Sequence, residues 1–147
     1  MFIGRFLHTI DSKGRLSIPM QFREVLADRY EEKLIITTDL DPCLVAFPIE
    51  EWRLIEEKAK NLPMMQKEVK DFFRIFYSGA VICSLDRQGR VLIPPSQREY
   101  AKLSREVTLI GMNSKIEVWD SKKWKEHVLE VPRSSEKIGE TLAHLGL

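Results

Sequence analysis

The sequence predicts an α+β, mainly β fold in which two tandem copies of one unit form a single pseudo-twofold, barrel-like core with flanking helices. Three observations support this prediction. A thirteen-residue motif occurs twice at an offset of 75 residues, apolar residues alternate before the turn in each copy, and amphipathic helical patterns follow. A chain of 147 residues with 44% hydrophobic residues can bury such a core.

The repeated motif covers residues 11–23 in the first copy and 86–98 in the second. Six of its thirteen positions are identical, where unrelated segments would share about one, so the chain contains a duplication. Further along, Trp52 matches Trp124 at an offset of 72, and we expect the three-residue length difference in the loop of residues 37–42. A unit of about 60 residues is marginal alone, so the copies should pack together as an internal pseudo-dimer.

Each motif opens with an Asp-x-x-Gly-Arg turn. The Asp can accept backbone N–H bonds, and the Gly supplies the left-handed conformation that a type I turn with a bulge needs. The turn-structuring residues are Asp11, Gly14, Asp86 and Gly89. Residues 2–10 and 77–85 alternate as strands before the turns, and residues 15–18 read as a return strand. We therefore expect each turn to be the tip of a two-stranded ribbon.

The remaining elements follow from proline positions and apolar spacing. After a short helix, each copy continues with a hairpin, and two amphipathic helices bridge the copies. The expected domains are 1–62 (first repeat with its helix), 63–76 (bridging helix), 77–130 (second repeat with its helix) and 131–147 (tail helix). Asp120 should cap the last helix of the second repeat. The short tail helix could dock on its own subunit or on a neighbour.

Composition and residue types argue against several function classes. His8, His127 and His144 are scattered, and no nucleophile motif or phosphate-binding Gly-rich loop is present, so we expect no enzyme. Cys43 and Cys83 form no metal-binding pattern, so neither a metal nor a cofactor is expected. No apolar run approaches the length of a membrane span. A net charge of +1 neither requires nor excludes a nucleic-acid partner, because local clustering matters more.

The two turns carry the basic side chains. The candidate DNA-binding residues are Lys13, Arg15, Arg87, Gln88, Arg90 and Arg5. A second interpretation of the two turn arginines is structural, because a carboxylate four residues earlier could bind each guanidinium and brace the turn. The spacing leaves both interpretations open.

The sequence also resembles a known family. The opening Met-Phe-Ile-Gly, the two Asp-x-x-Gly-Arg turns each followed by Ile-Pro, and Phe-Pro-Ile-Glu-Glu-Trp at 47–52 are similar to the MraZ family of bacterial transcriptional regulators. The resemblance covers nearly the whole chain. It implies swapped-hairpin units like those of AbrB and SpoVT, and a cytoplasmic, nucleoid-associated protein. It also implies sequence-specific binding to double-stranded DNA at promoter direct repeats, usually repressing a division and cell-wall gene cluster that includes its own gene.

The resemblance and the turns together predict a mechanism. Two basic tips could enter a DNA groove, with Arg15 and Arg90 reading guanine or holding phosphates. Lys13 and Arg87 would contact phosphates, Gln88 would be a polar contact, and Arg5, Arg23 or Arg98 could flank the site. We expect a homo-oligomer, in the form of a ring, with Trp52, Phe73 and Leu142 as candidate contact surfaces. The alternative is an antitoxin-like or other protein-interaction module without specific DNA readout.

Overall fold

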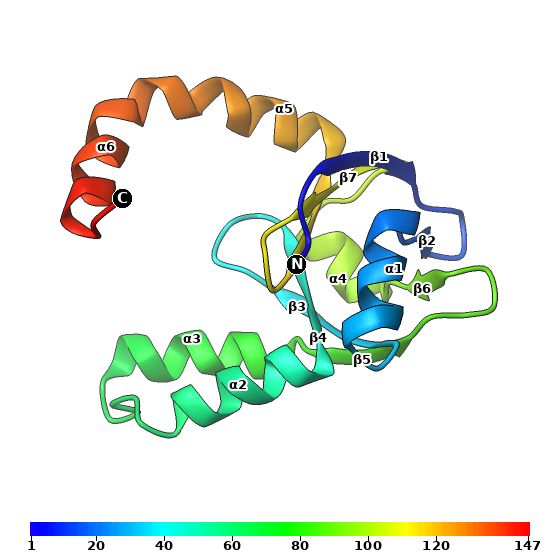
Figure 1. Cartoon of the computed structure of the whole chain (residues 1–147), viewed down its shortest axis with the longest axis horizontal. Coiled ribbons are helices and arrows are strands. Elements are labelled where there is room, and N and C mark those ends of the chain that lie inside the picture. The colour runs from blue at the N-terminus through cyan, green and yellow to red at the C-terminus, as the bar shows by residue number, and fades with distance from the viewer.

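The computed structural model describes residues 1–147 and contains eight strands and six α-helices (Figure 1). Most of the strands surround one core, from which two helical arms extend. The strands are β1 (Arg5–Thr9), β2 (Arg15–Ser17), β3 (Lys33–Thr38), β4 (Leu44–Pro48), β5 (Val81–Ser84), β6 (Arg90–Leu92), β7 (Glu106–Gly111) and β8 (Ile116–Asp120). The helices are α1 (Met20–Arg29), α2 (Ile49–Ala59), α3 (Lys67–Ser78), α4 (Pro95–Tyr100), α5 (Ser121–Glu130) and α6 (Ser135–His144), with a 3₁₀ turn η1 (Val131–Ser134) between the last two.

Prolines mark the points where strands give way to helices. Pro19, Pro48 and Pro94 stand immediately before α1, α2 and α4, with φ values of −52°, −54° and −61°. Proline fixes φ near the helical value and lacks the backbone N–H that a strand ladder needs. The sequence therefore sets the length of the short β2 and β6 strands, and with it the position of the turns before them.

The strands of the two repeats are exchanged. All pairs are antiparallel, with six strands in the order β1-β7-β8-β4-β3-β5 and a separate two-stranded ribbon of β2 and β6. Strand β1 of the first repeat pairs with β7 of the second, and β5 of the second pairs with β3 of the first. Strands β4 and β8 pair across the centre. Neither repeat forms a complete sheet by itself, which confirms the prediction of one shared core.

The expected ribbon within each repeat was wrong in its pairing. Strands β1 and β2 form no ladder, and their backbone pairing is limited to an isolated bridge between Ile10, just after β1, and Leu16, because β2 pairs instead with β6. The exchange offers β1 five residue pairs with β7, whereas β2 is only three residues long. More backbone groups are satisfied in the exchanged arrangement.

The strand register confirms the pseudo-twofold symmetry. In the ribbon Leu16 faces Val91, and in the large sheet Val45 faces Glu117. Each pair joins residues that occupy the same position in the two repeats, so the axis runs between these two points. Helix α1 is longer than α4. Lys33, at the start of β3, faces Ser84, and Glu106, at the start of β7, faces Thr9, so Lys33 and Glu106 occupy equivalent positions. Most of the length difference therefore lies before the third strand, and only the remainder lies between the third and fourth strands, where all of it was expected.

Both repeats contribute to the main core. It contains 18 buried side chains, and the fully buried Phe2 and the partly buried Phe6 both pack edge-on against Phe22, with centroid distances of 5.5 Å and 5.0 Å. Every residue of β4 is buried, because one face of this central strand contacts the main core and the other contacts the helical arm. This shared burial stabilises the exchanged strands.

Helices α2 and α3 form the first arm and enclose a second apolar cluster. The indole of Trp52 stacks on the ring of Phe76 with 5.0 Å between centroids, and Phe73 is buried in the same cluster. Trp52 and Phe73 are thus unavailable as the contact surfaces that the sequence suggested. Helix α3 also includes Tyr77, which was expected to begin a strand, because its ring packs against those of Trp52 and Phe73.

Helices α5 and α6 form the second arm (Figure 1). The side chain of Asp120 accepts a hydrogen bond from the backbone N–H of Lys123 and caps α5, as predicted. Every residue from 131 to 147 is exposed, so α6 does not dock on the core of its own chain. None of the helices combines the length and the apolar character that crossing a membrane would need.

Candidate nucleic-acid interface

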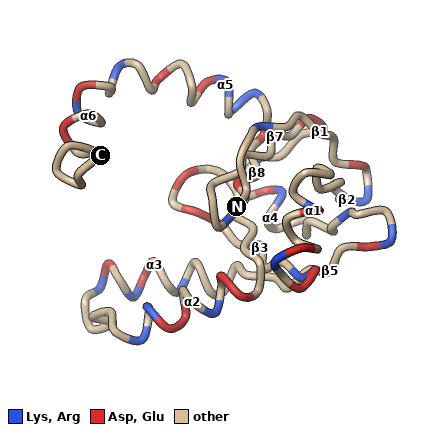
Figure 2. The backbone as a smooth tube through the Cα atoms, viewed as in Figure 1, with Lys and Arg blue, Asp and Glu red and all other residues tan.

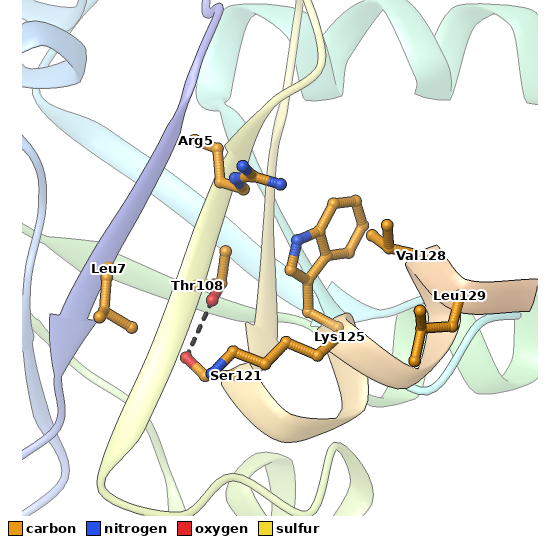
Figure 3. Close-up of a pocket in the computed structure, with 8 residues that line it drawn as sticks. Arg5, Leu7, Thr108, Ser121, Lys125, Val128 and Leu129 are labelled. Atoms are coloured by element: carbon orange, nitrogen blue, oxygen red, sulfur yellow. Dashed lines mark hydrogen bonds between the residues drawn. The ribbon is translucent and has the colours of Figure 1, made fainter. Parts of the chain in front are cut away.

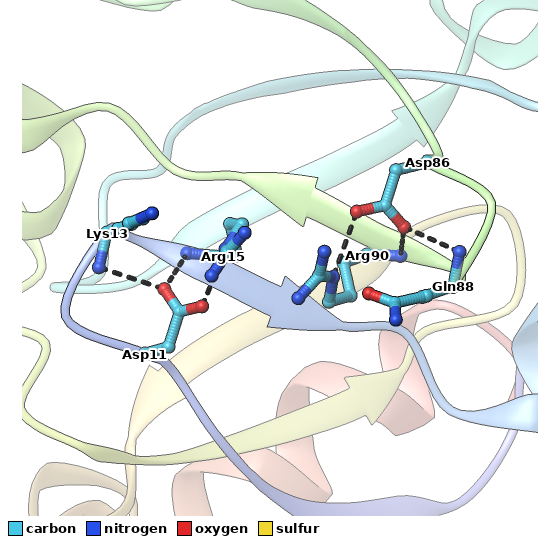
Figure 4. A network of polar contacts seen from close by, with 6 residues as sticks. All are labelled: Asp11, Lys13, Arg15, Asp86, Gln88 and Arg90. Atoms are coloured by element: carbon cyan, nitrogen blue, oxygen red, sulfur yellow. Dashed lines mark hydrogen bonds and ion pairs between the residues drawn. The ribbon is translucent and has the colours of Figure 1, made fainter.

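The first turn is organised by the carboxylate of Asp11. Its Oδ1 accepts the backbone N–H groups of Lys13 and Arg15, both at 2.9 Å, and its Oδ2 accepts Nε–H of Arg15 at 2.6 Å (Figure 4). The backbone N–H of Gly14 donates to the carbonyl of Asp11, and φ of Gly14 is +85°. The turn is therefore held closed by side chain and backbone together.

The second turn repeats this geometry. The carboxylate of Asp86 accepts the backbone N–H groups of Gln88 and Arg90 at 2.9 Å, and Nε–H of Arg90 at 2.9 Å (Figure 4). Gly89 has φ of +73°, and its N–H donates to the carbonyl of Asp86. Two segments with different residues at positions two and three of the turn thus share one conformation.

The same contacts change the ionisation of both aspartates. The pKa of Asp11 lies below its ordinary value of 3.8, mainly because the backbone N–H of Arg15 binds the carboxylate, with the guanidinium adding to this effect. The pKa of Asp86 is lowered for the same reason by Arg90. Hydrogen bonds to the charged form favour it, so both carboxylates are ionised at neutral pH.

The bracing contact leaves most of each guanidinium free. Only Nε of Arg15 and of Arg90 is engaged, and neither Nη1 nor Nη2 of either residue makes a hydrogen bond within the chain. Side-chain exposure is 36% for Arg15 and 26% for Arg90. The two interpretations that the spacing left open are therefore compatible, because the aspartate can orient the guanidinium while its two terminal nitrogens face solvent.

The ribbon of β2 and β6 places both arginines on one surface. Leu16 and Val91 point into the core, so their neighbours Arg15 and Arg90 project from the opposite face. Arg15 pairs with Leu92, two positions from Arg90, which makes the arginines diagonal neighbours. We call this outward face, with the two turns of residues 11–15 and 86–90 at its ends, the basic ribbon.

The other candidate residues divide into two groups. Lys13, Arg87 and Gln88 are exposed on the two turns. The turns between β1 and β2 and between β5 and β6 lie on the side of the core that faces away from the helical arms (Figure 2). Arg5 lies at the far end of β1, about 20 Å along the strand from Asp11. It lines a groove of about 500 Å³ beside α5 with Leu7, Trp124 and Leu129 (Figure 3). The structure thus does not bring Arg5 to the basic ribbon.

Sequence reasoning placed Arg23 and Arg98 beside the site but missed their partners. Each is half-buried and covers the glycine of the turn in the other repeat, Arg23 over Gly89 and Arg98 over Gly14. The exchange of strands produces these contacts, and a single repeat carries no signal for them. The one signal in the sequence was that Arg23 and Arg98 lie at the same distance from their own turns, which indicates equivalent roles in the two repeats.

One group of side chains has the composition of a metal site. The ligand atoms of Asp39, Cys43 and Glu117 lie within 4.8 Å of one another. However, burial first, and then the charges of Glu117 and Asp39, raise the pKa of the Cys43 thiol, so the thiol stays protonated. Glu117 already accepts Nε1–H of Trp119 at 2.9 Å. We assign no metal to this group.

Comparison with known proteins places these features in a family. A family model whose description names the MraZ protein and likens it to antitoxins matches residues 1–75 and 76–144. A protein of Desulfitobacterium hafniense named "Transcriptional regulator MraZ" is 43% identical over 147 residues, covering 100% of both chains. Proteins of the same name from Caldicellulosiruptor saccharolyticus and Acetivibrio thermocellus are 42% and 44% identical over 147 residues.

The structure contains two interleaved copies of a swapped-hairpin unit, with braced basic turns on one outward ribbon. The class of protein is therefore a tandem swapped-hairpin protein. The family match extends over both copies and divides the chain where the second repeat begins. The chain belongs to the MraZ family.

Proposed function

We propose that this protein is a DNA-binding transcriptional regulator that contacts duplex DNA through the basic ribbon. The observation that carries the proposal is the pair of braced arginines on one outward face, each with two unpartnered terminal nitrogens. A two-stranded ribbon fits the major groove of B-DNA, which is about 12 Å wide. The names of the relatives agree with this function.

The residues of the basic ribbon make different kinds of contact with DNA in this proposal. Arg15 and Arg90 fork to O6 and N7 of guanine, the contact that an oriented guanidinium makes best. Lys13 and Arg87 hold phosphates, and Gln88 makes a polar contact. Because Lys13 corresponds to Gln88 and Ser12 to Arg87, the two turns read DNA unequally. Arg5 lies too far along β1 to share one turn's contacts, and we propose at most a flanking role for it.

The target follows from the family resemblance. We propose that the protein binds direct repeats in its own promoter and represses the division and cell-wall gene cluster that contains its gene. Such a regulator works on the nucleoid in the cytoplasm.

We propose further that the working form is a homo-oligomeric ring. Two apolar surfaces support this: the groove between β1 and α5, and the exposed residues Ile138, Leu142 and Leu145 of the tail helix. Surfaces of this kind mark contact sites in soluble proteins. Several basic ribbons on one assembly would bind adjacent repeats about 10² to 10⁴ times more tightly than one ribbon binds a single repeat.

The test is binding to the upstream region of its own gene. Fluorescence anisotropy should show tight binding to this fragment, weaker binding to a probe with one repeat, and only salt-sensitive weak binding to a scrambled sequence. Equal affinity for the native and scrambled fragments would contradict specific readout. It would favour the alternative that the family description suggests, an antitoxin-like module that binds a protein partner.

A further inference from the structure

Each glycine of the basic turns is covered by an arginine from the other repeat. A Cβ added to Gly89 would lie 2.8 Å from Cζ of Arg23, which belongs to α1 of the first repeat. A Cβ added to Gly14 would lie 3.1 Å from Cζ and from Nε of Arg98, which belongs to α4 of the second repeat. The absent side chain of each glycine thus leaves a notch that the guanidinium of the other repeat fills.

Backbone hydrogen bonds follow the same crossed pattern. The N–H of Ile18 donates to the carbonyl of Gly89 at 2.9 Å, and the N–H of Ile93 donates to the carbonyl of Gly14 at 2.8 Å. Each turn is therefore fixed from outside its own repeat at both its glycine carbonyl and its glycine Cα. By contrast, Asp11 and Asp86 act only within their own turns.

Packing dominates the arginine contact. Nε of Arg23 and Nε of Arg98 are buried, and neither has a hydrogen-bond partner in the chain. What Arg23 supplies to the second turn is contact area against the glycine, from Cδ to the guanidinium. A notch of this shape exists only while the glycine keeps its left-handed φ, so filling it favours the closed turn.

We propose that Arg23 and Arg98 are positioning residues that act across the repeats: Arg23 holds the second turn and orients Arg90, and Arg98 holds the first turn and orients Arg15. This inference rests on the proposed DNA binding for its functional consequence. Its structural part does not. Loss of Arg23 should impair the DNA contacts of the second repeat, although Arg23 itself belongs to the first.

Amide hydrogen exchange tests the structural part without DNA. In Arg23→Ala the amides of Gly89 and Ile18 should exchange about tenfold faster, while those of Gly14 and Ile93 stay within about twofold of wild type. Arg98→Ala should give the reverse pattern. The control is Arg29→Ala, which removes an exposed cation from the same helix α1 and should change neither pair. Faster exchange at Gly14 in Arg23→Ala, or an equal change at both turns, overturns the proposal.

Selection from random DNA tests the functional part. Arg15→Ala and Arg90→Ala first identify the base positions that each arginine reads. Arg23→Ala should then lose the preference that Arg90→Ala loses, and Arg98→Ala the preference that Arg15→Ala loses. If Arg23→Ala instead weakens all sequences equally, Arg23 is a phosphate contact and the proposal fails.

A methionine variant and the wild-type DNA-binding result separate a failure of the positioning role from a failure of the proposed function. Arg23→Met keeps an unbranched stem without the charge and should restore most of the protection at Gly89, so equal exchange in the Met and Ala variants also overturns the proposal. Arg23→Met also replaces Arg23→Ala in the exchange experiment if the Ala variant does not fold. A wild-type protein that binds no DNA would defeat the proposed function, and the exchange patterns would then decide the positioning role alone.

Discussion

Trp52 stacks on Phe76 with 5.0 Å between ring centroids, whereas Trp124, its counterpart in the second repeat, has no helix covering it. Helix α3 supplies the cover in the first repeat, whereas α6, which follows α5 as α3 follows α2, is exposed along its whole length and leaves Trp124 uncovered. Nε1 of Trp124 is buried without a hydrogen-bond partner, beside the groove that Leu7, Val128 and Leu129 line. The pseudo-twofold symmetry therefore ends at this groove.

The first prediction concerns that surface. Leu129→Asp places a charge in the groove and should shift the protein from oligomer toward monomer, because burying an unpaired carboxylate at an interface is costly. Light scattering coupled to gel filtration at micromolar concentration measures the mass. Met65→Asp, at a residue 90% exposed between α2 and α3, should leave the mass unchanged. A wild-type protein that runs as a monomer would rule out the proposed ring.

The second prediction concerns the braced arginines. Arg15→Ala and Arg90→Ala should each weaken specific DNA binding by about 1 to 3 kcal/mol if they read bases. The melting temperature should fall only slightly, since each ion pair lies near the surface. Anisotropy and thermal unfolding on the same samples separate the two effects. A lowered melting temperature with unchanged affinity per folded molecule would mean that the arginines only brace the turns.

Lys13→Ala provides the contrast for these variants. It should weaken binding to all sequences alike and reduce the slope of log K against log salt by roughly 0.9, as expected for one phosphate contact. Lys58→Ala, an exposed lysine on α2, is the matched control and should leave the slope unchanged. A sequence-dependent loss in Lys13→Ala would instead indicate base contact.

The third prediction uses the turn glycines. Gly14→Ala should destabilise the protein by about 1 to 3 kcal/mol, because alanine is strained at φ of +85°. The new Cβ would also lie 2.7 Å from the carbonyl oxygen of Ile93. Gly139→Ala in α6 meets no atom within 4 Å and should be neutral or slightly stabilising. Urea unfolding of both variants is the measurement, and equal stabilities would contradict the role assigned to the turn.

The fourth prediction concerns acid. Asp11 and Asp86 have folded pKa values below the ordinary value of 3.8, so their carboxylates stabilise the turns at pH values above it. This contribution is lost as pH falls through the folded pKa values. Asp11→Asn with Asp86→Asn should therefore lower stability at pH 7, and the difference from wild type should shrink below about pH 4. Unfolding curves between pH 7 and pH 2.5 test this, and a constant difference would refute it.

The sequence predicted the parts of the site that depend on neighbouring residues. An aspartate four residues before an arginine, with a glycine between them, is enough to specify the closed turn. The repeat at a fixed offset also indicated two units around one axis. These features are local or are visible as internal similarity, so no knowledge of long-range pairing was needed.

Long-range contacts were the part that the sequence could not supply. The pairing of β1 with β7 depends on competition between partners far apart in the chain, and so do the contacts of Arg23 with Gly89. Tyr77 continues a helix because aromatic rings from α2 and α3 surround it, although its alternating pattern is typical of a strand. Tertiary packing overrides local preference at such positions.

The joining of two unequal turns in one chain gives the molecule a polarity. A dimer of identical hairpins would bind a palindrome equally well in either orientation. Here Lys13 is matched by Gln88 and Ser12 by Arg87 on an otherwise twofold scaffold, so reversing the protein on DNA exchanges unlike contacts. Bound as proposed, the protein would distinguish upstream from downstream, and its sites would be ordered head to tail instead of mirrored.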